Sequence, residues 1–197
     1  MVGIAGPIAA GKSTVSHFLV GMGAREIDAD AVCHRYLREE EAISEIVKHF
    51  GTDILDKHGN PDRWKLGRIV FNEEKYVSIL NRILHPFLME EVEQEVEESR
   101  EHGVMLVLNS ALLFESGIDE LCDYIITVTA NLEVRRHRAL TKRGWPPGEI
   151  KKRESYFIPL EEKIERSDFI IENNGNYEDL QKRTEEVFRE IVNDKQS

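Results

Sequence analysis

Residues 6–14 are the first stretch of the chain whose types and spacing could do chemistry, because they fit the pattern G-x-x-x-x-G-K-[ST]. An apolar run at 2–5 precedes them and an amphipathic pattern follows, which predicts a strand, a loop and a helix in that order. Such a loop binds a triphosphate, because successive backbone N–H groups and the helix N-terminus surround the anion. We expect the N–H donors to come from positions 8–14.

The side chains of this loop predict how the nucleotide is held. Lys12 is expected to bridge the β- and γ-phosphates, and the Ser13 hydroxyl to ligate Mg²⁺. Pro7 and Ala9 are unusual fillers, since Pro7 donates no N–H and Ala9 adopts a positive φ only at a cost of about 1 kcal/mol or more. We expect the loop to form in spite of both. The residues predicted to bind the nucleotide here are Ala9, Ala10, Gly11, Lys12, Ser13 and Thr14.

Two carboxylates, Asp28 and Asp30, follow a second short strand that is expected to end at Asp28. In open parallel sheets the carboxyl ends of the strands border the ligand crevice. A carboxylate there could accept a hydroxyl proton during phosphoryl transfer, or hold a metal through water. The alternative is that Asp30 N-caps a helix starting near Ala31.

A basic segment at 135–153 stands out in an acidic chain. It includes Arg135, Arg136, Arg138, Lys142, Arg143, Lys151, Lys152 and Arg153, opposed by Glu149 alone. A mobile cationic arm suits a phosphoryl-transfer site, because closing it neutralises the migrating charge and excludes water. Residues 144–148, Gly-Trp-Pro-Pro-Gly, are the expected flexible tip. The alternative is a solvated helix face.

Five apolar runs, alternating with helical patterns, must position these residues. They lie at 2–5, before 28, at 104–108, at 124–128 and at 169–171. Near-continuous apolar strands predict an α/β fold with a parallel sheet covered on both faces. The long interval after the second strand predicts extra helices at about 31–50, 62–84 and 86–101, because a crossover needs only a dozen or more residues.

Composition excludes several other classes of protein. The 197 residues include 26 Lys and Arg against 37 Asp and Glu, so the net charge is −11, which argues against a general nucleic-acid or anionic-membrane binder. No apolar stretch approaches the ~20 residues of a membrane span, and the N-terminus lacks a signal-peptide pattern. With only two cysteines, a reducing cytoplasm is the expected location.

Taken together, the motifs resemble those of the dephospho-coenzyme A kinase family over nearly the whole chain. Besides the phosphate loop and basic segment, the resemblance rests on Ile-Asp-Ala-Asp at 27–30, Phe-Gly at 50–51, Ile-Leu at 54–55, Asp-Arg at 62–63, Leu66, Val-Phe at 70–71, Ile-Leu-His-Pro at 83–86, Leu-Leu-Phe-Glu at 112–115, Pro-Leu-Glu-Glu-Lys at 159–163, and 168–175. The loop alone is generic, whereas Asp-Ala-Asp, His-Pro and Leu-Leu-Phe-Glu in this order are specific.

The resemblance implies a P-loop nucleoside-kinase-like fold in three layers, with a five-stranded parallel sheet, a helical insertion and a lid. The core would comprise 1–30, 102–134 and 165–197, the acceptor-binding insertion about 31–101, and the lid about 135–164. The implied reaction is the phosphorylation of dephospho-coenzyme A by ATP, giving ADP and coenzyme A. The acceptor atom is the ribose 3′-hydroxyl.

Site residues also follow from the resemblance. Asp30 matches the family's general base, and Arg138 and Arg153 resemble lid arginines that clamp phosphates. With Lys12 they form the expected catalytic set. Phe71, Leu80, His85 and Pro86 lie in the part that resembles the acceptor site, where His85 is expected to pack or cap. The residues expected near adenine are Asn173, Asn174 and Gly175.

The chain also departs from the family pattern. Asn109 and Ala111 replace an Asp and a Pro after the third strand, Phe157 replaces a lid Gln, and Pro7 and Ala9 replace loop glycines. We therefore expect an active but divergent kinase that uses ATP and Mg²⁺ and binds neither nucleic acid nor membrane. The alternatives are another P-loop kinase, of the nucleoside monophosphate or shikimate type, and an inactive nucleotide-binding regulator. Oligomeric state is not predicted.

Overall fold

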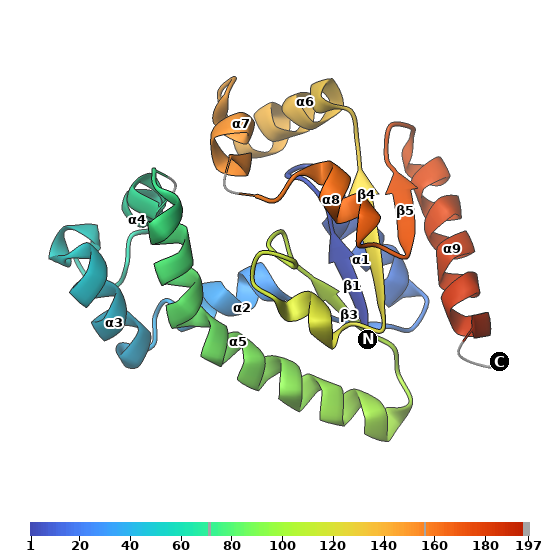
Figure 1. Cartoon of the computed structure of the whole chain (residues 1–197), viewed down its shortest axis with the longest axis horizontal. Helices are drawn as coiled ribbons and strands as arrows, with labels where there is room; N and C mark the ends of the chain where they lie inside the picture. The colour runs from blue at the N-terminus through green and yellow to red at the C-terminus, as the bar shows by residue number, and fades with distance from the viewer. Residues whose placement is uncertain (71, 156, 195–197) are drawn as a thin grey trace. The chain divides into compact units, whose positions relative to one another are not determined.

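The computed structural model describes residues 1–70, 72–155 and 157–194 (Figure 1). Contacts divide the chain into two compact units, which are described separately below. The first unit comprises Met1–Asp28 and Glu95–Ser197, and the second comprises Ala29–Gln94. Within the described residues, no helix combines the length and the apolar character needed to span a membrane.

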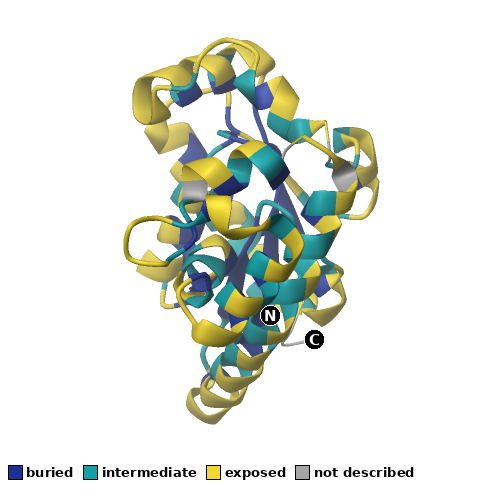
Figure 2. Cartoon of the chain, turned by 90° about the vertical axis from the view of Figure 1, so that its left-hand side faces the viewer, coloured by how far each residue is buried: buried dark blue, intermediate teal, exposed yellow. Residues whose placement is uncertain are grey.

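A five-stranded sheet forms the centre of the first unit, as the sequence predicts. Its order is β2 (Arg25–Asp28), β3 (Leu106–Asn109), β1 (Val2–Ala5), β4 (Tyr124–Thr129) and β5 (Phe169–Glu172). Every neighbouring pair is parallel, so all five carboxyl ends lie along one edge. The buried residues gather on these strands in Figure 2. This burial explains why the three inner strands, β3, β1 and β4, are nearly continuous apolar runs, whereas the edge strands β2 and β5 each bury a single residue.

Two helices cover one face of this sheet. α1 (Lys12–Gly21) and α9 (Tyr177–Asp194) pack on side chains such as Ile4, Ile126 and Ile171. In α9, Leu180 and Ile191 are buried, whereas Tyr177 remains 58% exposed while its ring packs against Phe18.

The opposite face is covered by the segment after β3, by η2 (Ile118–Leu121) and by α8 (Leu160–Glu165). Gly3 of β1 lies so close to this layer that an added Cβ would come within 2.8 Å of the Cys122 sulfur. Thr127 of β4 and Ser167 after α8 share a hydrogen bond of 2.7 Å. The result is the expected three-layer arrangement, helix–sheet–helix.

Helices α6 (Leu132–Arg143) and α7 (Glu149–Glu154) carry the basic segment, and Figure 1 shows them beyond the carboxyl end of β4. Gly144 ends α6 with a φ of 64°, and Gly148 precedes α7 with a φ of 91°. The link between them is therefore rich in turns. The tip packs inward through Trp145, which joins Ile8, Ala139 and Ile150 in a small apolar cluster.

The second unit is helical. It contains α2 (Ala29–Tyr36), α3 (Glu40–Phe50), η1 (Thr52–Ile54), α4 (Arg63–Val70) and the first part of α5 (Glu74–His102). Ring contacts of 4.7 Å between Tyr36 and Phe87 and 5.7 Å between Phe50 and Tyr76 hold these helices together. The Asp62 carboxylate accepts the N–H groups of Trp64 and Lys65, which caps α4.

The predicted helix boundaries in this unit were wrong in two places. The stretch 31–50 is two helices, α2 and α3, and the break expected between 84 and 86 falls instead before Glu74. Pro86 lies inside the continuous helix α5. A proline removes one backbone hydrogen bond, but the flanking Leu84 and Leu88 are both buried, and their packing keeps the helix continuous.

Candidate functional site

The predicted phosphate loop joins β1 to α1, and its two outer glycines are required by close contacts. Gly6 has a φ of 131°, and an added Cβ there would lie 2.1 Å from the carbonyl oxygen of Val128. Gly11 has a φ of 110°, and its added Cβ would lie 2.2 Å from Nδ2 of Asn173. The glycine spacing of the motif is thus fixed by neighbouring backbone and side chains as well as by the turn itself.

The middle of the loop forms despite its unusual residues. Ala9 adopts a φ of 60°, in the left-handed region, and the N–H of Ala10 donates to the Pro7 carbonyl over 3.3 Å. The N–H of Ile8 donates to Glu154 over 2.7 Å, so within the expected range of 8–14 this position offers no open donor. Across the described parts of the chain, the N–H groups of Ala9, Gly11 and Ser13 donate to no protein acceptor. Open backbone N–H groups of this kind are suited to binding an anion.

Lys12 and Ser13 occupy the first turn of α1. The Lys12 ammonium lies 2.9 Å from the carbonyl oxygen of Gly6 and 3.2 Å from that of Pro7. The ammonium is therefore folded back onto the loop. Ser13 is exposed and Thr14 is half-buried beside it.

Arg138 and Asn173 meet behind the loop, although they come from α6 and from the end of β5. Both donate to the carbonyl oxygen of Ala10, at 3.1 Å and 2.7 Å. Arg138 also donates to the carbonyl and side-chain oxygens of Asn173, each at 3.1 Å. Burial lowers the pKa of Arg138 from its ordinary value. The structure thus brings two predicted site residues into contact with the loop.

The other residues predicted near adenine lie just beyond Asn173. The Asn174 side chain accepts the N–H of Asn131 over 2.7 Å, which ties the end of β5 to the start of α6. Gly175 follows, and an added Cβ would meet the Asp179 carboxylate at 2.7 Å.

Arg153 lies on α7, in the same arm as Arg138. It donates to Glu149 over 2.7 Å, and its guanidinium lies 4.3 Å from the centre of the Trp145 ring. Arg143 approaches the same ring at 4.9 Å. Two guanidinium groups therefore lie against the half-buried Trp145 indole at the tip of the arm.

The carboxyl edge of the sheet aligns three chain positions. Ile4 of β1 is in register with Asn109 of β3, and Asn109 with Asp28 of β2. Asn109 is buried and donates to the Glu26 carboxylate over 3.0 Å. Asn109, which replaces an Asp of the family pattern, thus hydrogen-bonds to a carboxylate on the neighbouring strand β2. Within the described residues, no three histidine, cysteine or carboxylate side chains form a ready metal cage.

Asp30 lies in the first turn of α2, two residues after β2 ends, and is exposed. The alternative that it N-caps a helix starting near Ala31 was wrong, because α2 already begins at Ala29. A carboxylate in a first helical turn is nonetheless stabilised by the positive end of the helix dipole.

The residues expected near the acceptor lie along α5 and just before it. His85 is half-buried in the helix interior, so it does not cap a helix end, and Leu80 is also half-buried. Pro86 is exposed and borders a groove of about 450 Å³ in the second unit, together with His49, Arg82 and Phe87. Phe71 lies outside the described residues.

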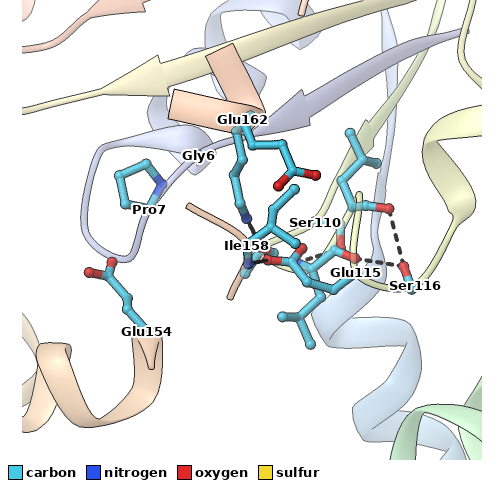
Figure 3. A network of polar contacts seen from close by, with 12 residues as sticks. Gly6, Pro7, Ser110, Glu115, Ser116, Glu154, Ile158 and Glu162 are labelled. Atoms are coloured by element: carbon cyan, nitrogen blue, oxygen red, sulfur yellow. Dashed lines mark hydrogen bonds and ion pairs between the residues drawn. The ribbon is translucent and has the colours of Figure 1, made fainter. Parts of the chain in front are cut away.

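A buried ion pair near the loop was not predicted. Glu115, after β3, lies 2.8 Å from the Lys163 ammonium, and their side chains are 9% and 2% exposed. Glu115 also accepts the N–H of Ile158, where the arm returns to the core (Figure 3). The sequence contained the motifs at 112–115 and 159–163, but their spacing alone does not show that the two side chains meet.

Comparison with known proteins gives a consistent result. The family model described as dephospho-CoA kinase matches residues 1–179. A dephospho-CoA kinase of Aquifex aeolicus is 36% identical over 98% of both chains. One of Fusobacterium nucleatum is 38% identical over 94% of this chain and 95% of its own.

Solved structures agree with these sequence matches. A Thermus thermophilus protein covers 96% of both chains with a TM-score of 0.80 and 32% identity. A dephospho-CoA kinase from Campylobacter jejuni covers the same share with a TM-score of 0.69 and 28% identity. A shikimate kinase from Acinetobacter baumannii, 14% identical with a TM-score of 0.55, shares the fold alone.

Proposed function

The chain belongs to the dephospho-CoA kinase family, and from this membership and the loop geometry we propose that it phosphorylates the ribose 3′-hydroxyl of dephospho-coenzyme A with ATP. The products are ADP and coenzyme A, so the reaction is the last step of coenzyme A biosynthesis. The observation that carries the proposal is a phosphate loop that keeps its two outer glycines, Lys12 and Ser13, in a chain that matches the family almost from end to end.

ATP is held, in this proposal, by the loop and by the segment after β5. The open N–H groups of Ala9, Gly11 and Ser13 receive phosphate oxygens, and Lys12 moves from the Gly6 carbonyl to the β- and γ-phosphates. Thr14 and the N-terminal turn of α1 add to the same cradle. Asn173, Asn174 and Gly175 border the adenine. Asn173 adjoins the loop through the Ala10 carbonyl, and the other two residues follow it directly in the chain.

The donor set fits Mg²⁺. Mg²⁺ usually keeps several waters and is bound through one or two carboxylates together with substrate phosphates, so no protein cage is needed. Ser13 is exposed in the first turn of α1, and Asp28 is exposed at the carboxyl edge of the sheet. When bound there, the ion neutralises charge on the β- and γ-phosphate oxygens. Asn109 contributes no charge to this set.

Asp30 is the proposed general base. Its place immediately after the sheet edge supports this role, since the carboxyl ends of parallel strands border the ligand crevice. The carboxylate accepts the proton of the 3′-hydroxyl as that oxygen attacks the γ-phosphorus in line, and the β-phosphate oxygen leaves with ADP. Positioning and charge stabilisation supply most of the rate.

The domain roles belong to the same proposal. Residues 1–30, 102–134 and 165–197 act as the nucleotide-binding core, and about 31–101 receive the acceptor. Residues about 135–164 act as the lid, in which Arg138 and Arg153 bind phosphate charge. Arg138 is already at the loop, and Arg153 lies on α7 in the same arm.

Mass spectrometry of the product tests the function. The protein is incubated with ATP, Mg²⁺ and dephospho-coenzyme A, and we expect a product heavier by one phosphate on the ribose 3′ oxygen. Lys12→Ala should largely abolish it. Transfer to shikimate or to a nucleoside monophosphate alone would indicate another kinase of this fold. ATP binding without transfer to any acceptor would indicate a regulator.

A further inference from the structure

Both peptide groups of Ile8, in the phosphate loop, are held by one buried ion pair. Glu154, at the end of α7, accepts the Ile8 N–H over 2.7 Å. Arg135, on α6, donates to the Ile8 carbonyl over 3.2 Å and to the same Glu154 oxygen over 2.5 Å. The two side chains are only 10% and 19% exposed. Figure 3 shows the Glu154 carboxylate directed from α7 towards the loop beside Pro7.

The held residue directly precedes a strained one. Ala9 has a φ of 60°, a conformation that an L side chain rarely adopts and that glycine adopts freely. On its other side, the Ala10 carbonyl is bound by Arg138 and Asn173. Ala9 is therefore the strained position between two anchored peptide units, and the anchors oppose its relaxation.

The charge of the pair also matters at this position. A lone carboxylate against the loop would repel a triphosphate, whereas Arg135 neutralises Glu154 and leaves the loop able to accept an anion. Arg135 also donates to the Ala130 carbonyl over 3.2 Å, which fixes the guanidinium to the end of β4. The pair is thus anchored to the core on one side and to the loop on the other.

We propose that Arg135 and Glu154 are positioning residues that hold the phosphate loop in its nucleotide-accepting shape and so compensate for alanine at position 9. The inference rests on the proposed function, because it takes the loop to bind ATP. Since the pair comes from α6 and α7, it couples the shape of the loop to the base of the arm that carries Arg138 and Arg153.

The experiment measures the ATP dissociation constant by calorimetry, and kcat and KM by product formation. Glu154→Ala should raise the dissociation constant and the KM for ATP roughly ten-fold, because a buried charge-assisted bond is lost and the loop relaxes at Ala9. The kcat at saturating ATP should change much less. Arg135→Gln should weaken binding more than Glu154→Gln, because only the former leaves the carboxylate unneutralised beside the phosphates.

Glycine at position 9 provides the decisive comparison. In an Ala9→Gly background the strain is absent, so adding Glu154→Ala should weaken ATP binding by no more than about three-fold. A pair that merely stabilises the fold would give the same loss in both backgrounds. The matched control is Glu133→Ala on α6, which removes an exposed ion pair with Arg136, one residue from Arg135, and should leave ATP affinity unchanged.

Two outcomes would overturn the inference: wild-type ATP affinity in both Glu154→Ala and Glu154→Gln, or equal losses with alanine and with glycine at position 9. If Glu154→Ala does not fold, Glu154→Gln, which keeps the side-chain volume, gives the same comparison. Failure of the proposed function is distinct, because it would appear in the wild-type protein as ATP binding without phosphorylation of dephospho-coenzyme A.

Discussion

At the scale of single residues, the phosphate loop is defined by what its glycines exclude. A Cβ at Gly6 or Gly11 would approach fixed neighbours to within 2.2 Å or less, so neither position tolerates a side chain. Ala9, in contrast, accepts a left-handed backbone with its methyl group in place. The loop therefore has glycine at positions 6 and 11, where a side chain would not fit. At position 9 a side chain fits, and only the left-handed backbone is unfavourable, so contacts on either side of Ala9 can hold it.

Asp30→Asn tests the base at this scale. Asparagine keeps the size of the side chain but cannot take up the proton of the acceptor hydroxyl, so kcat should fall by roughly 10²- to 10⁴-fold. The ATP dissociation constant should stay within about two-fold, because phosphate binding is assigned to the loop and not to α2. Steady-state kinetics and calorimetry on the same preparation measure both values. A near-normal kcat would remove Asp30 from the base role.

Cys122 gives a prediction about pH. Burial raises the pKa of this thiol from 9.0 to about 12. Between those values the unfolded chain loses the thiol proton while the folded protein keeps it, so rising pH favours unfolding. The contribution of Cys122 to stability is complete below pH 9 and lost as the pH approaches 12. Urea unfolding of wild-type protein and Cys122→Ala from pH 8.5 upwards should therefore show the steeper decline in the wild type, and parallel curves would contradict it.

At the scale of elements, the ion pair between Glu115 and Lys163 connects α8 to the segment after β3. Lys163 also donates to the Ala111 carbonyl over 3.4 Å, and Glu115 receives the N–H of Ile158. Three pieces of chain thus meet at one buried pair. This arrangement explains a charged residue inside a core helix layer, where an isolated charge would be costly.

Lys163→Ala should lower the free energy of unfolding by about 3–5 kcal/mol, because it leaves the Glu115 carboxylate buried without its partner. The second change Glu115→Gln, made in the same chain, should recover part of the loss by removing that charge. Urea denaturation measures both. Lys182→Ala, on the exposed face of α9, is the control and should change stability by about 0.5 kcal/mol or less. A loss no larger than that of the control would mean that the buried pair does not stabilise the fold.

Element boundaries show where local pattern is insufficient. In the sequence, Pro86 predicts a helix boundary, yet α5 continues through it from Glu74 to His102. The local cost of proline is overcome by the burial of Leu84 and Leu88 on either side. The capping contribution of Asp62, by comparison, acts within its own segment and coincides with the predicted start at 62.

At the scale of the whole molecule, we expect each substrate to protect the backbone amides of a different unit from hydrogen exchange. A non-hydrolysable ATP analogue should raise amide protection at residues 6–14 and 131–155, because binding stabilises the segments that contact the nucleotide. Dephospho-coenzyme A alone should raise protection within residues 29–94. Hydrogen exchange read by mass spectrometry measures both. Protection by dephospho-coenzyme A confined to the first unit would contradict the assignment of the acceptor to the insertion.

The parallel sheet, the phosphate loop and the presence of a helical insertion could be predicted from sequence, because each depends on residues close together in the chain. Apolar runs mark buried strands, and the loop motif specifies glycines, Lys12 and Ser13 at fixed spacing. The basic segment at 135–153 likewise follows from local charge. These features are encoded within windows of about ten residues.

Tertiary structure alone decided which residues far apart in the chain meet in the loop and in the core. Glu154 bonds to Ile8 across 146 positions, and Lys163 to Ala111 across 52. The sequence shows that Arg135 belongs to the basic segment. It does not show that this arginine is buried while the neighbouring Arg136 is exposed. Such pairings depend on where the sheet order and the crossover helices bring chain segments together, and no local pattern carries that information.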